Sequence, residues 1–475
     1  MRFTTAVGPM EPVAALDNIE PLPTRLPARP RPNSGRRQAL GLTAVWVFVL
    51  GNAAGMVWLW IHGGNLTTKS TGDVLTSIAR ITGLISAYLA LIQVILLARV
   101  PALERLVGFD RLIVWHRWNG HACLDLVLAH VFFSVWGYAA LDKVSIPKEI
   151  STMLGGGIYP GMITATVGTF LLIAVVATSI VIVRRRLRYE WWHAVHLLAY
   201  AGIALAWFHQ IPTGNELVLD TVAADYWRAL YVATIAVIVI WRLLLPALKA
   251  LRHRLHVVDV VEEAPGVVSV HIAGRGLDRL SARPGQFFLW RFVTRGSWWT
   301  SHPFSLSAAP TNDALRITVK ALGDHTSRMA RISPGTRVVA EGPFGVFTAA
   351  ARRREKVLLV AGGIGITPVR ALLEELSGDV VVIYRVFSEP EIVFAEELGV
   401  LTAERGAALH YVVGDHATEE GARLLSPEHL HELVPDIAER DVFLCGPPAM
   451  IAHTETSIRR AGVKRRHLHV ERFAL

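Results

Sequence analysis

The sequence predicts a membrane all-α six-helix bundle, followed by an antiparallel β-barrel and then by an α/β Rossmann-like domain. Three observations lead to this prediction. The 475 residues are enough for roughly three domains. Charged residues make up only 18% of the chain, whereas soluble proteins have about 25%. Long uncharged runs occur before residue 250, and short alternating runs separated by turns occur after it.

Six apolar segments account for the first domain, residues 41–250. The preceding residues 1–40 contain seven prolines and six arginines, which is typical of a disordered tail and not of a signal peptide. The run from Gly41 to Ile61 has 21 residues without a charge, close to the ~20 that cross a hydrocarbon core. We expect the other spans at about 75–98, 112–138, 164–183, 191–211 and 226–245.

Lysine and arginine are divided unequally between the two sets of connecting segments. Sixteen of them lie in one set, and three lie in the alternate loops 62–74, 139–163 and 212–225. The first set consists of residues 1–40, 99–111, 184–190 and 246–254. This bias predicts a multi-pass protein of the cell membrane, in contact with lipid, with both termini in the cytoplasm.

Composition also excludes several classes of protein. The net charge of +9 arises mainly around the spans, so it does not indicate a nucleic-acid-binding protein. The two cysteines, Cys123 and Cys445, are too few for an iron–sulfur cluster, a thiolate zinc site or a disulfide scaffold.

Six histidines fall in the third and fifth spans, where an ionisable side chain normally faces a cavity, a partner or a cofactor. His116 and His130 are 14 residues apart, which is ~21 Å along a helix and nearly the same face. His196 and His209 are 13 residues apart, or ~20 Å, so each can face a histidine of the third span. The spacing predicts two haems stacked across the bilayer, each with two axial histidines.

Two features of the fifth span complicate this assignment. On an ideal helix His209 lies ~140° from His196, so we expect a distortion near the end of the span, where Pro212 stands. His193 lies only ~60° from His196 and is the alternative ligand. In the third span, His121 lies on the opposite face and is interpreted as a non-ligand.

In these two spans the chain resembles the ferric reductase and NADPH oxidase superfamily of transmembrane b-type cytochromes. The segments that carry the resemblance are FDRLIVWHRWNGHACLDLVLAH and RYEWWHAVHLLAYAGIALAWFH. It implies that His116 and His196 ligate a haem on the cytoplasmic side, and that His130 and His209 ligate a second haem on the outer side. Arg80, near the outer end of the second span, would neutralise haem propionates, contact the electron acceptor, or simply snorkel to the interface.

Residues 251–350 alternate as the strands of a small antiparallel barrel do. Expected strands include His256–Val261, Val267–Ile272, Phe287–Phe292 and Leu315–Val319. Three motifs follow the order seen in ferredoxin-reductase-like flavoproteins: HPFS at 302–305, after Trp298 and Trp299 at the end of a strand, KALGDHT at 320–326, and GPFG at 342–345.

The resemblance to these flavoproteins implies an FAD site in the barrel. Phe304 would lie along the isoalloxazine, Ser305 would hydrogen-bond near flavin N5, and His302 would approach the pyrophosphate. The backbone around Gly323 to Thr326 would complete the phosphate cradle. The residues assigned to FAD in this way are His302, Pro303, Phe304, Ser305, Gly323 and Thr326.

Residues 351–475 begin as a parallel β-α-β unit. The expected strand Val357–Ala361 leads into GGIGITP at 362–368 and a helix near 369–376, and the strand Val380–Tyr384 follows. Glycines in such a turn let backbone N–H groups approach a pyrophosphate. A second loop, CGPPAM at 445–450, ends the strand Asp441–Leu444, and the family's nicotinamide pocket uses this pair of loops.

The nucleotide predicted for this domain is NADPH, with NADH as the alternative. Arg385 follows the second strand and could pair with a 2′-phosphate. The thiol of Cys445 would be near the hydride path. Phe473, close to the end at Leu475, resembles the family's terminal aromatic, which stacks on the flavin until nicotinamide displaces it. The expected nucleotide-binding residues are Gly362, Gly363, Gly365, Thr367, Pro368, Arg385, Cys445, Gly446 and Pro447, and the expected catalytic residues are Cys445, Phe473 and Ser305.

The resemblance therefore implies a transmembrane flavocytochrome that passes electrons from cytosolic NADPH through FAD and two b-type haems to an outer acceptor. Ferric iron and dioxygen are the expected acceptors, although Ser134 stands where oxidase branches have a further histidine. Alternatives are a reductase that delivers electrons to quinone or a partner protein, and a non-catalytic haem carrier or sensing subunit. No obligate protein partner, nucleic acid or calcium control is expected.

Overall fold

The computed structural model describes residues 34–473, apart from 156–157, 181–182, 184–185, 188, 214–217, 219, 295–299, 416–417, 419–420 and 422. Most of the predicted tail, together with Trp298, Trp299, Ala474 and Leu475, lies outside the described residues. The chain divides into two compact units, a helical unit of residues 33–245 and a second unit that contains residues 246–475.

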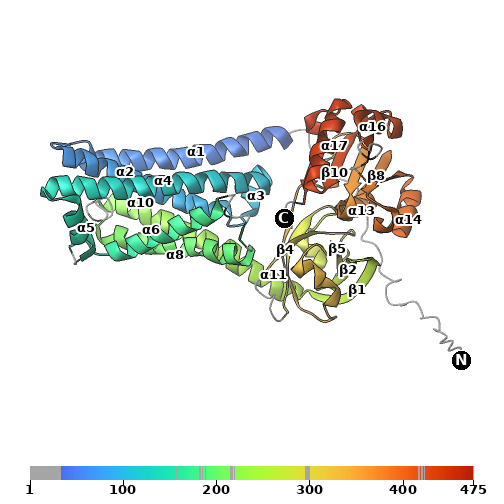
Figure 1. Ribbon diagram of the computed structural model, residues 1–475, viewed down its shortest axis with the longest axis horizontal. Coiled ribbons are helices and arrows are strands. Elements are labelled where there is room, and N and C mark those ends of the chain that lie inside the picture. The colour runs from blue at the N-terminus through green and yellow to red at the C-terminus, as the bar shows by residue number, and fades with distance from the viewer. Residues whose placement is uncertain are drawn as a thin grey trace. The chain divides into compact units, whose positions relative to one another are not determined.

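Within the described residues, six helices are long and apolar enough to cross a membrane, as hydropathy predicted. Their cores are α1 Ser34–Trp60, α2 Thr71–Leu96, α4 Phe109–Asp142, α6 Met162–Ser179, α8 Tyr189–Thr213 and α10 Thr221–Ile238 (Figure 1). The first helix begins at Ser34, so residues 34–40 are helical and not part of a disordered tail. Arginine, glutamine, alanine and leucine before Gly41 are good helix formers, which explains the earlier start.

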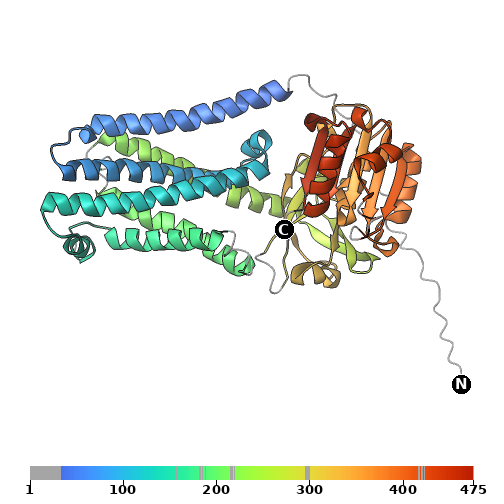
Figure 2. The ribbon, with the colours of Figure 1, turned by 45° about the horizontal axis from the view of Figure 1, so that its top comes forward.

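Shorter helical segments connect or extend these spans. They are α3 Pro101–Val107, α5 Ile146–Gly155 and α11 Leu245–His253, with π-helical turns at Ile61–Asn65 and Val239–Leu244. The long helices run along the bundle, with α5 at one end and α3 at the other (Figures 1 and 2).

Small residues let helices of the bundle pack closely in two pairs, α2 with α4 and α6 with α8. A methyl group added at Gly137 of α4 would lie 2.7 Å from Thr76 Cγ2 of α2. One added at Gly168 of α6 would lie 2.7 Å from the Gly202 carbonyl oxygen of α8. Larger side chains at these glycines would push the paired helices apart.

The strand-rich domain differs from the predicted barrel, because the described strands do not close into one. Its strands are β1 His256–Ala264, β2 Val267–Ala273, β3 Phe287–Phe292, β4 His302–Ser305, β5 Ala314–Lys320 and β6 Val338–Phe344. They form two three-stranded antiparallel sheets, β1-β2-β5 and β4-β3-β6. Isolated bridges join His256 to Arg337 and Leu306 to Ile317. Among the described residues these bridges are isolated, so no continuous ladder forms between the sheets.

The two sheets enclose one apolar core. Alternate residues of β3, namely Phe288, Trp290 and Phe292, are completely or almost completely buried in it. The HPFS motif is itself the strand β4 and pairs with β3, from Trp290 opposite His302 to Phe287 opposite Ser305. The motif is therefore a short separate strand and not the end of a longer one.

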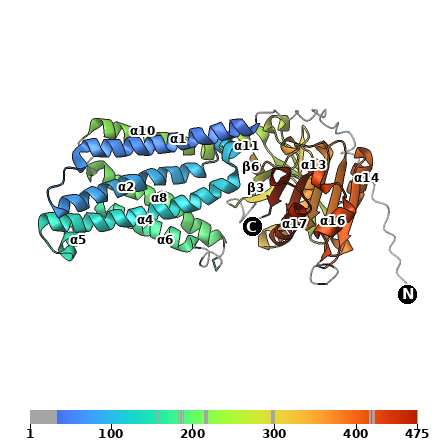
Figure 3. The same ribbon diagram turned by 90° about the horizontal axis from the view of Figure 1, so that it is seen from above.

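The last domain is a five-stranded parallel sheet in the order β11-β10-β7-β8-β9. Its elements are β7 Val357–Gly362, α13 Ile366–Glu375, β8 Val380–Val386, α14 Ala395–Arg405, β9 Ala408–Val413, α16 Pro427–Leu433, β10 Asp441–Gly446, α17 Pro448–Arg460 and β11 Leu468–Arg472. Helices α13 and α14 pack into one core cluster, and α16 and α17 pack into a second. Figure 3 shows these helices around the sheet.

The strand order reverses between β7 and β10. From β7 the chain proceeds to β8 and β9 on one side, and it then returns to β10 and β11 on the other. In parallel α/β sheets, ligands bind beyond the carboxyl ends of the strands at such a switch point. The two loops that follow β7 and β10 are therefore the expected nucleotide-binding edge.

Candidate functional site

The helical bundle brings the four predicted histidine ligands together in two pairs. The rings of His116 on α4 and His196 on α8 have centres 6.0 Å apart, and those of His130 and His209 are 6.3 Å apart. One pair lies toward the α3 end of α4, and the other lies toward the α5 end. The periodicity argument therefore selected the residues that face each other.

Each of these four imidazoles has its Nδ1 beside an oxygen atom. His116 Nδ1 lies 3.2 Å from the Gln93 carbonyl oxygen, and His130 Nδ1 lies 2.7 Å from that of Ala79. On α8, His196 Nδ1 lies 3.2 Å from Ser179 Oγ, and His209 Nδ1 contacts the Ala206 carbonyl oxygen. Metal-bound histidines are oriented in this way, because a proton held on one ring nitrogen leaves the other nitrogen as the ligand.

The ring separations fit one metal ion between each pair. Two metal–nitrogen bonds of about 2 Å each, plus the short distance from each ring nitrogen to its ring centre, total about 6 Å. Within the described residues no group of three or more histidine, cysteine or acidic side chains could hold a metal ion. Two facing imidazoles are the donor set of a group with two axial ligands, as in a bis-histidine haem.

The other histidines of these helices occupy different surroundings. His121 is exposed on α4, as the helical wheel predicted for a non-ligand. His193, the alternative ligand, makes a ring contact with Trp192 at 6.4 Å between centres. Helix α8 is helical as far as Thr213 with Pro212 inside it. Pro212 therefore does not break the helix, and His209 faces His130 from within a continuous helix.

Sequence reasoning missed the α2 residues that hold these histidines. A Cβ added at Gly83 would lie 2.7 Å from His130 Nδ1, so only glycine leaves room for that ring. Carbonyl oxygens of α2 serve as partners for His116 and His130, and any residue type supplies a carbonyl. A glycine within an apolar helix facing the histidine-bearing span was the only available sequence signal.

Arg80 lies next to Ala79, whose carbonyl holds His130. Its Nη1 donates to Asn65 Oδ1 at 2.9 Å, and Asn65 is buried. The predicted arginine therefore lies at the same end of the bundle as the His130–His209 pair, with an amide partner that the sequence analysis did not identify.

In the strand-rich domain, the HPFS strand is held by its neighbour β3. Trp290 Nε1 donates to the Phe304 carbonyl oxygen at 2.9 Å, and the Ser305 side chain is buried. Phe304 remains partly exposed, as a residue that contacts a planar ligand must be. Its ring lies parallel to that of His302, with centres 6.3 Å apart.

The phosphate-binding loop predicted at 323–326 lies against the same strand. The His325 ring stacks on His302 with centres 3.6 Å apart, and His325 Nε2 is buried without a hydrogen-bond partner among the described residues. Burial, with the charges of His302 and Arg328, lowers the pKa of His325 to about 4. Thr326 Oγ1 accepts from the backbone N–H groups of Leu322 and Gly323 at 2.9 and 3.0 Å. A buried imidazole nitrogen without a partner fits the oxygen-rich pyrophosphate of FAD.

The two loops at the strand-order switch point touch each other. A Cβ added at Gly365 would clash with the Cys445 carbonyl oxygen, and one at Gly446 would lie 3.2 Å from Gly362 Cα. Thr367 Oγ1 donates to the Ile364 carbonyl oxygen at 3.0 Å, which ties the turn to the start of α13. The glycines are thus needed for the close approach of the loops, as well as for access by a ligand.

The remaining predicted nucleotide residues lie around these loops. Cys445 is completely buried on β10, and burial raises the pKa of its thiol well above the usual range. Arg385 pairs in register with Gly362, and its guanidinium donates to the carbonyl oxygens of Val386 and Val412. Phe473 packs against the core cluster that contains Cys445.

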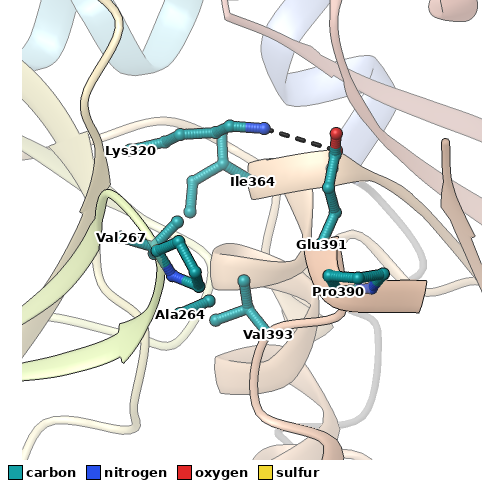
Figure 4. A pocket seen from close by; sticks show the side chains of 9 residues that line it. Ala264, Val267, Lys320, Ile364, Pro390, Glu391 and Val393 are labelled. Atoms are coloured by element: carbon teal, nitrogen blue, oxygen red, sulfur yellow. Dashed lines mark hydrogen bonds and ion pairs between the residues drawn. The ribbon is translucent and has the colours of Figure 1, made fainter. Parts of the chain in front are cut away.

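A cavity of about 230 Å³ lies between the strand-rich domain and the nucleotide domain. Figure 4 shows Lys320, at the end of β5, reaching across it toward Glu391. Their Nζ and Oε2 atoms are 3.4 Å apart. Gly363 and Ile364 of the glycine-rich turn also line the cavity, so it adjoins the predicted nucleotide-binding edge.

Two buried arginines connect the same two domains at another point. Arg316 of β5 donates to both oxygens of Glu397 on α14 at 2.8 and 2.9 Å, and Arg370 of α13 donates to Glu397 Oε2 at 2.6 Å. Both arginines also donate to the Ser307 carbonyl oxygen at 3.1 Å. This arginine clamp, formed by Arg316, Arg370, Glu397 and Ser307, fixes the segment just after Ser305 against the nucleotide domain.

Comparison with known families gives three matches along the chain. Residues 82–207 match the ferric reductase like transmembrane component, residues 254–348 match the FAD-binding domain, and residues 359–456 match the oxidoreductase NAD-binding domain. These three matches agree with the fused domain order that the motifs predicted.

Individual relatives match part of the chain. It is 33% identical over 232 residues to the ferredoxin reductase component of 3-ketosteroid-9-alpha-monooxygenase from Mycolicibacterium smegmatis, covering 46% of this chain and 65% of the relative. It is 30% identical over 204 residues to an NADPH oxidoreductase of Mycobacterium tuberculosis, covering 41% and 52%. The chain thus spans about half to two thirds of these relatives. A similar solved structure is the flavohem-like FAD/NAD binding domain of nitric oxide dioxygenase from Vibrio cholerae, with 23% identity, a TM-score of 0.39, and coverage of 46% of this chain and 98% of that one.

Proposed function

Because this chain joins a ferric reductase-like transmembrane component to the FAD-binding and NAD-binding domains of an NAD(P)H-dependent oxidoreductase, we propose that it is a transmembrane flavocytochrome. It moves electrons from cytosolic NADPH through FAD and two b-type haems to an acceptor on the opposite side of the membrane. The observation that carries this proposal is the two facing histidine pairs, at 6.0 and 6.3 Å between ring centres.

The bundle supplies two ligand pairs at different depths. When bound, haem provides one-electron redox chemistry and FAD accepts the hydride of NADPH. His116 and His196 would hold the haem nearer α3, and His130 and His209 would hold the one nearer α5. An oxygen beside each Nδ1 can keep a proton on that nitrogen, which would leave Nε2 available to the metal. The 16-to-three division of basic residues supports a cytosolic position for the reductase domains.

The reductase residues place the two nucleotides. Ser305 would hydrogen-bond near flavin N5, and Phe304 would lie along the ring. His302, on which the His325 ring stacks, would lie at the FAD pyrophosphate. Gly362, Gly363 and Gly365, with the Cys445–Pro447 loop, hold NADPH at the switch point of the sheet. Further contacts come from Pro303, Gly323 and Thr326 to FAD and from Thr367, Pro368, Gly446 and Arg385 to NADPH.

Three further residues complete the proposed path. Cys445, as a neutral buried thiol, lines the hydride path without acting as a nucleophile. Phe473 would cover the flavin until nicotinamide displaces it. Arg80, which donates to Asn65 at the end of the bundle where the outer histidine pair lies, would neutralise a haem propionate. Ferric iron and dioxygen are the acceptors expected for this family, and a quinone is a second candidate.

The proposal is tested by adding NADPH to the purified protein under anaerobic conditions and recording the visible spectrum. We expect reduction of the flavin and then of two haems. His130→Leu should lose one haem and keep NADPH-to-FAD transfer, whereas the matched change His121→Leu, an exposed histidine of the same helix, should keep both. Absence of haem reduction in the wild-type protein, or two haems in His130→Leu, would refute the proposal.

A further inference from the structure

A pocket lies at the end of the bundle where the His130–His209 pair is found. Its volume is about 340 Å³, within the size range of small-ligand pockets. The lining runs from the end of α5 to the start of α6 and is mostly apolar: Met153, Leu154, Gly155, Tyr159, Pro160, Gly161, Met162, Ile163 and Thr164. None of these residues was singled out from the sequence.

One wall of this pocket touches the outer histidine. Gly161 packs so closely on α8 that a Cβ there would lie 2.8 Å from His209 Cα. Its φ of +82° is in the region that favours glycine, so both backbone conformation and space require this residue. A molecule in the pocket would therefore be separated from His209 by little more than the backbone of Gly161.

Among the described residues, the helix that ends in this pocket carries a buried carboxyl oxygen without a hydrogen-bond partner. Glu149 of α5 is only 1% exposed, and its Oε1 has no hydrogen-bond partner among the described residues. A buried carboxyl oxygen left unpaired is unfavourable for folding, so its presence calls for a function. Glu149 and Met153 are four residues apart and both buried, which places the carboxyl on the face of α5 that also lines the pocket.

Tyr159 connects this carboxyl to the pocket. Its ring packs edge-on against Tyr138 of α4, with centres 5.5 Å apart, and its side chain lines the cavity. Burial raises the pKa of Tyr159, and the nearby charges of Glu149 and Asp142 raise it further. Burial and Asp142 likewise raise the pKa of Glu149. Both pKa shifts are toward the protonated form, which can donate a hydrogen bond.

We propose that this pocket receives a quinone-class electron acceptor, to which Tyr159 donates a hydrogen bond and Glu149 supplies protons. This inference rests on the proposed function, because the electrons would arrive at the haem that His130 and His209 would hold. NADPH gives up two electrons and becomes NADP⁺ with release of one proton on its side. The quinone takes up the two electrons and two protons and becomes a quinol, and Glu149 is reprotonated from solvent on the pocket side. The apolar lining suits a planar, uncharged acceptor, whereas a ferric chelate is charged and its one-electron reduction needs no proton.

The test compares two acceptors in wild-type protein and Glu149→Gln, with menadione as the quinone and ferric citrate as the control. Menadione reduction that persists in His130→Leu reflects direct transfer from the flavin and is subtracted. We expect Glu149→Gln to lower the remaining menadione rate at least tenfold. Ferric citrate reduction, NADPH-dependent haem reduction, haem content and thermal unfolding should all stay within twofold or 2 °C of wild type.

A second variant tests the pocket without removing the acid. A Cβ at Gly155 meets open space, so Gly155→Phe can fill the cavity without a backbone clash. The matched control is Gly51→Phe on α1, where a Cβ also meets nothing within 4 Å. Gly155→Phe should raise the KM for menadione at least tenfold, and Gly51→Phe should leave it unchanged.

The two proposals fail in different ways. If NADPH reduces both haems but menadione reduction is absent after subtraction, or is equal in wild type and Glu149→Gln, the quinone proposal is overturned and the flavocytochrome proposal stands. An equal loss of menadione and ferric citrate reduction in Glu149→Gln also overturns the proton-donor role. If NADPH reduces no haem, both proposals fall.

Discussion

Removal of the Glu397 carboxylate should destabilise the contact between the two reductase domains. In Glu397→Ala, Arg316 and Arg370, each with a side chain only 11% exposed, lose three hydrogen bonds to one carboxylate. Breaking a buried ion pair costs about 3–5 kcal/mol. Because Glu397 itself is 36% exposed, solvent screening reduces this to about 2–3 kcal/mol. For a unit of this size, the melting temperature should fall by about 5–10 °C.

The assay is thermal unfolding of the full protein in detergent, followed by flavin fluorescence. The control is Glu396→Ala, which removes an exposed carboxylate one residue earlier on α14 and should change the melting temperature by less than 2 °C. The reasoning would be refuted if Glu397→Ala unfolded within 2 °C of wild type. Hydride transfer from NADPH to FAD should also slow. The two arginines that donate to the Ser307 carbonyl oxygen, two residues after Ser305, lose the carboxylate that fixes their position.

The same variant has a defined pH dependence. Burial alone would raise the pKa of Glu397, but hydrogen bonds and charges from Arg316 and Arg370 lower it to about 2. Because the folded-state pKa is below that of the unfolded chain, the carboxylate stabilises the fold fully above about pH 4.5, and this stabilisation is lost as the pH falls toward 2. The difference in melting temperature between wild type and Glu397→Ala should therefore be constant from pH 8 to 5 and shrink below that. A difference that grew on acidification would contradict this sign.

Three further predictions concern the candidate site. Gly83→Ala should displace the His130 ring, because the new Cβ would lie 2.7 Å from its Nδ1. We expect a pyridine haemochrome assay to show loss of the haem at that pair. The control Gly51→Ala, where a Cβ meets open space, should lose no haem. Arg385→Ala should raise the KM for NADPH at least tenfold and leave that for NADH within twofold, since only NADPH has a 2′-phosphate; equal changes in both would refute that role. Cys445, fully buried with a raised pKa, should react with N-ethylmaleimide at least 100-fold more slowly in the native protein than after unfolding, and rapid native labelling would show that the strand is open.

Local patterns predicted much of the architecture. Hydropathy located all six spans, because a helix that crosses a membrane must be apolar over its own length. The strand expected at Phe287–Phe292 has those bounds in the structure, because every second side chain of the strand is buried and must be apolar. Helical spacing singled out these histidines and the family resemblance paired them, and the rings of His116 with His196 and of His130 with His209 face each other in the structure. These features depend on residues close together in the chain.

Contacts between distant segments could not be predicted in this way. The described strands do not close into a barrel, because only isolated bridges link the two sheets. The Ala79 carbonyl oxygen contacts His130 Nδ1, and Gly83 leaves space for the ring because it has no side chain. A sequence does not show which carbonyl oxygen or which glycine has such a role.

The sequence by itself therefore determined the spans, the nucleotide-binding loops and the histidine pairs, because each is written in local periodicity or a short motif. Only the tertiary structure decided that Arg316 and Arg370 share the carboxylate of Glu397, and that Glu149 is buried near Tyr159. Burial and pairing of a charge depend on which other segments surround it, and that is a property of the folded chain.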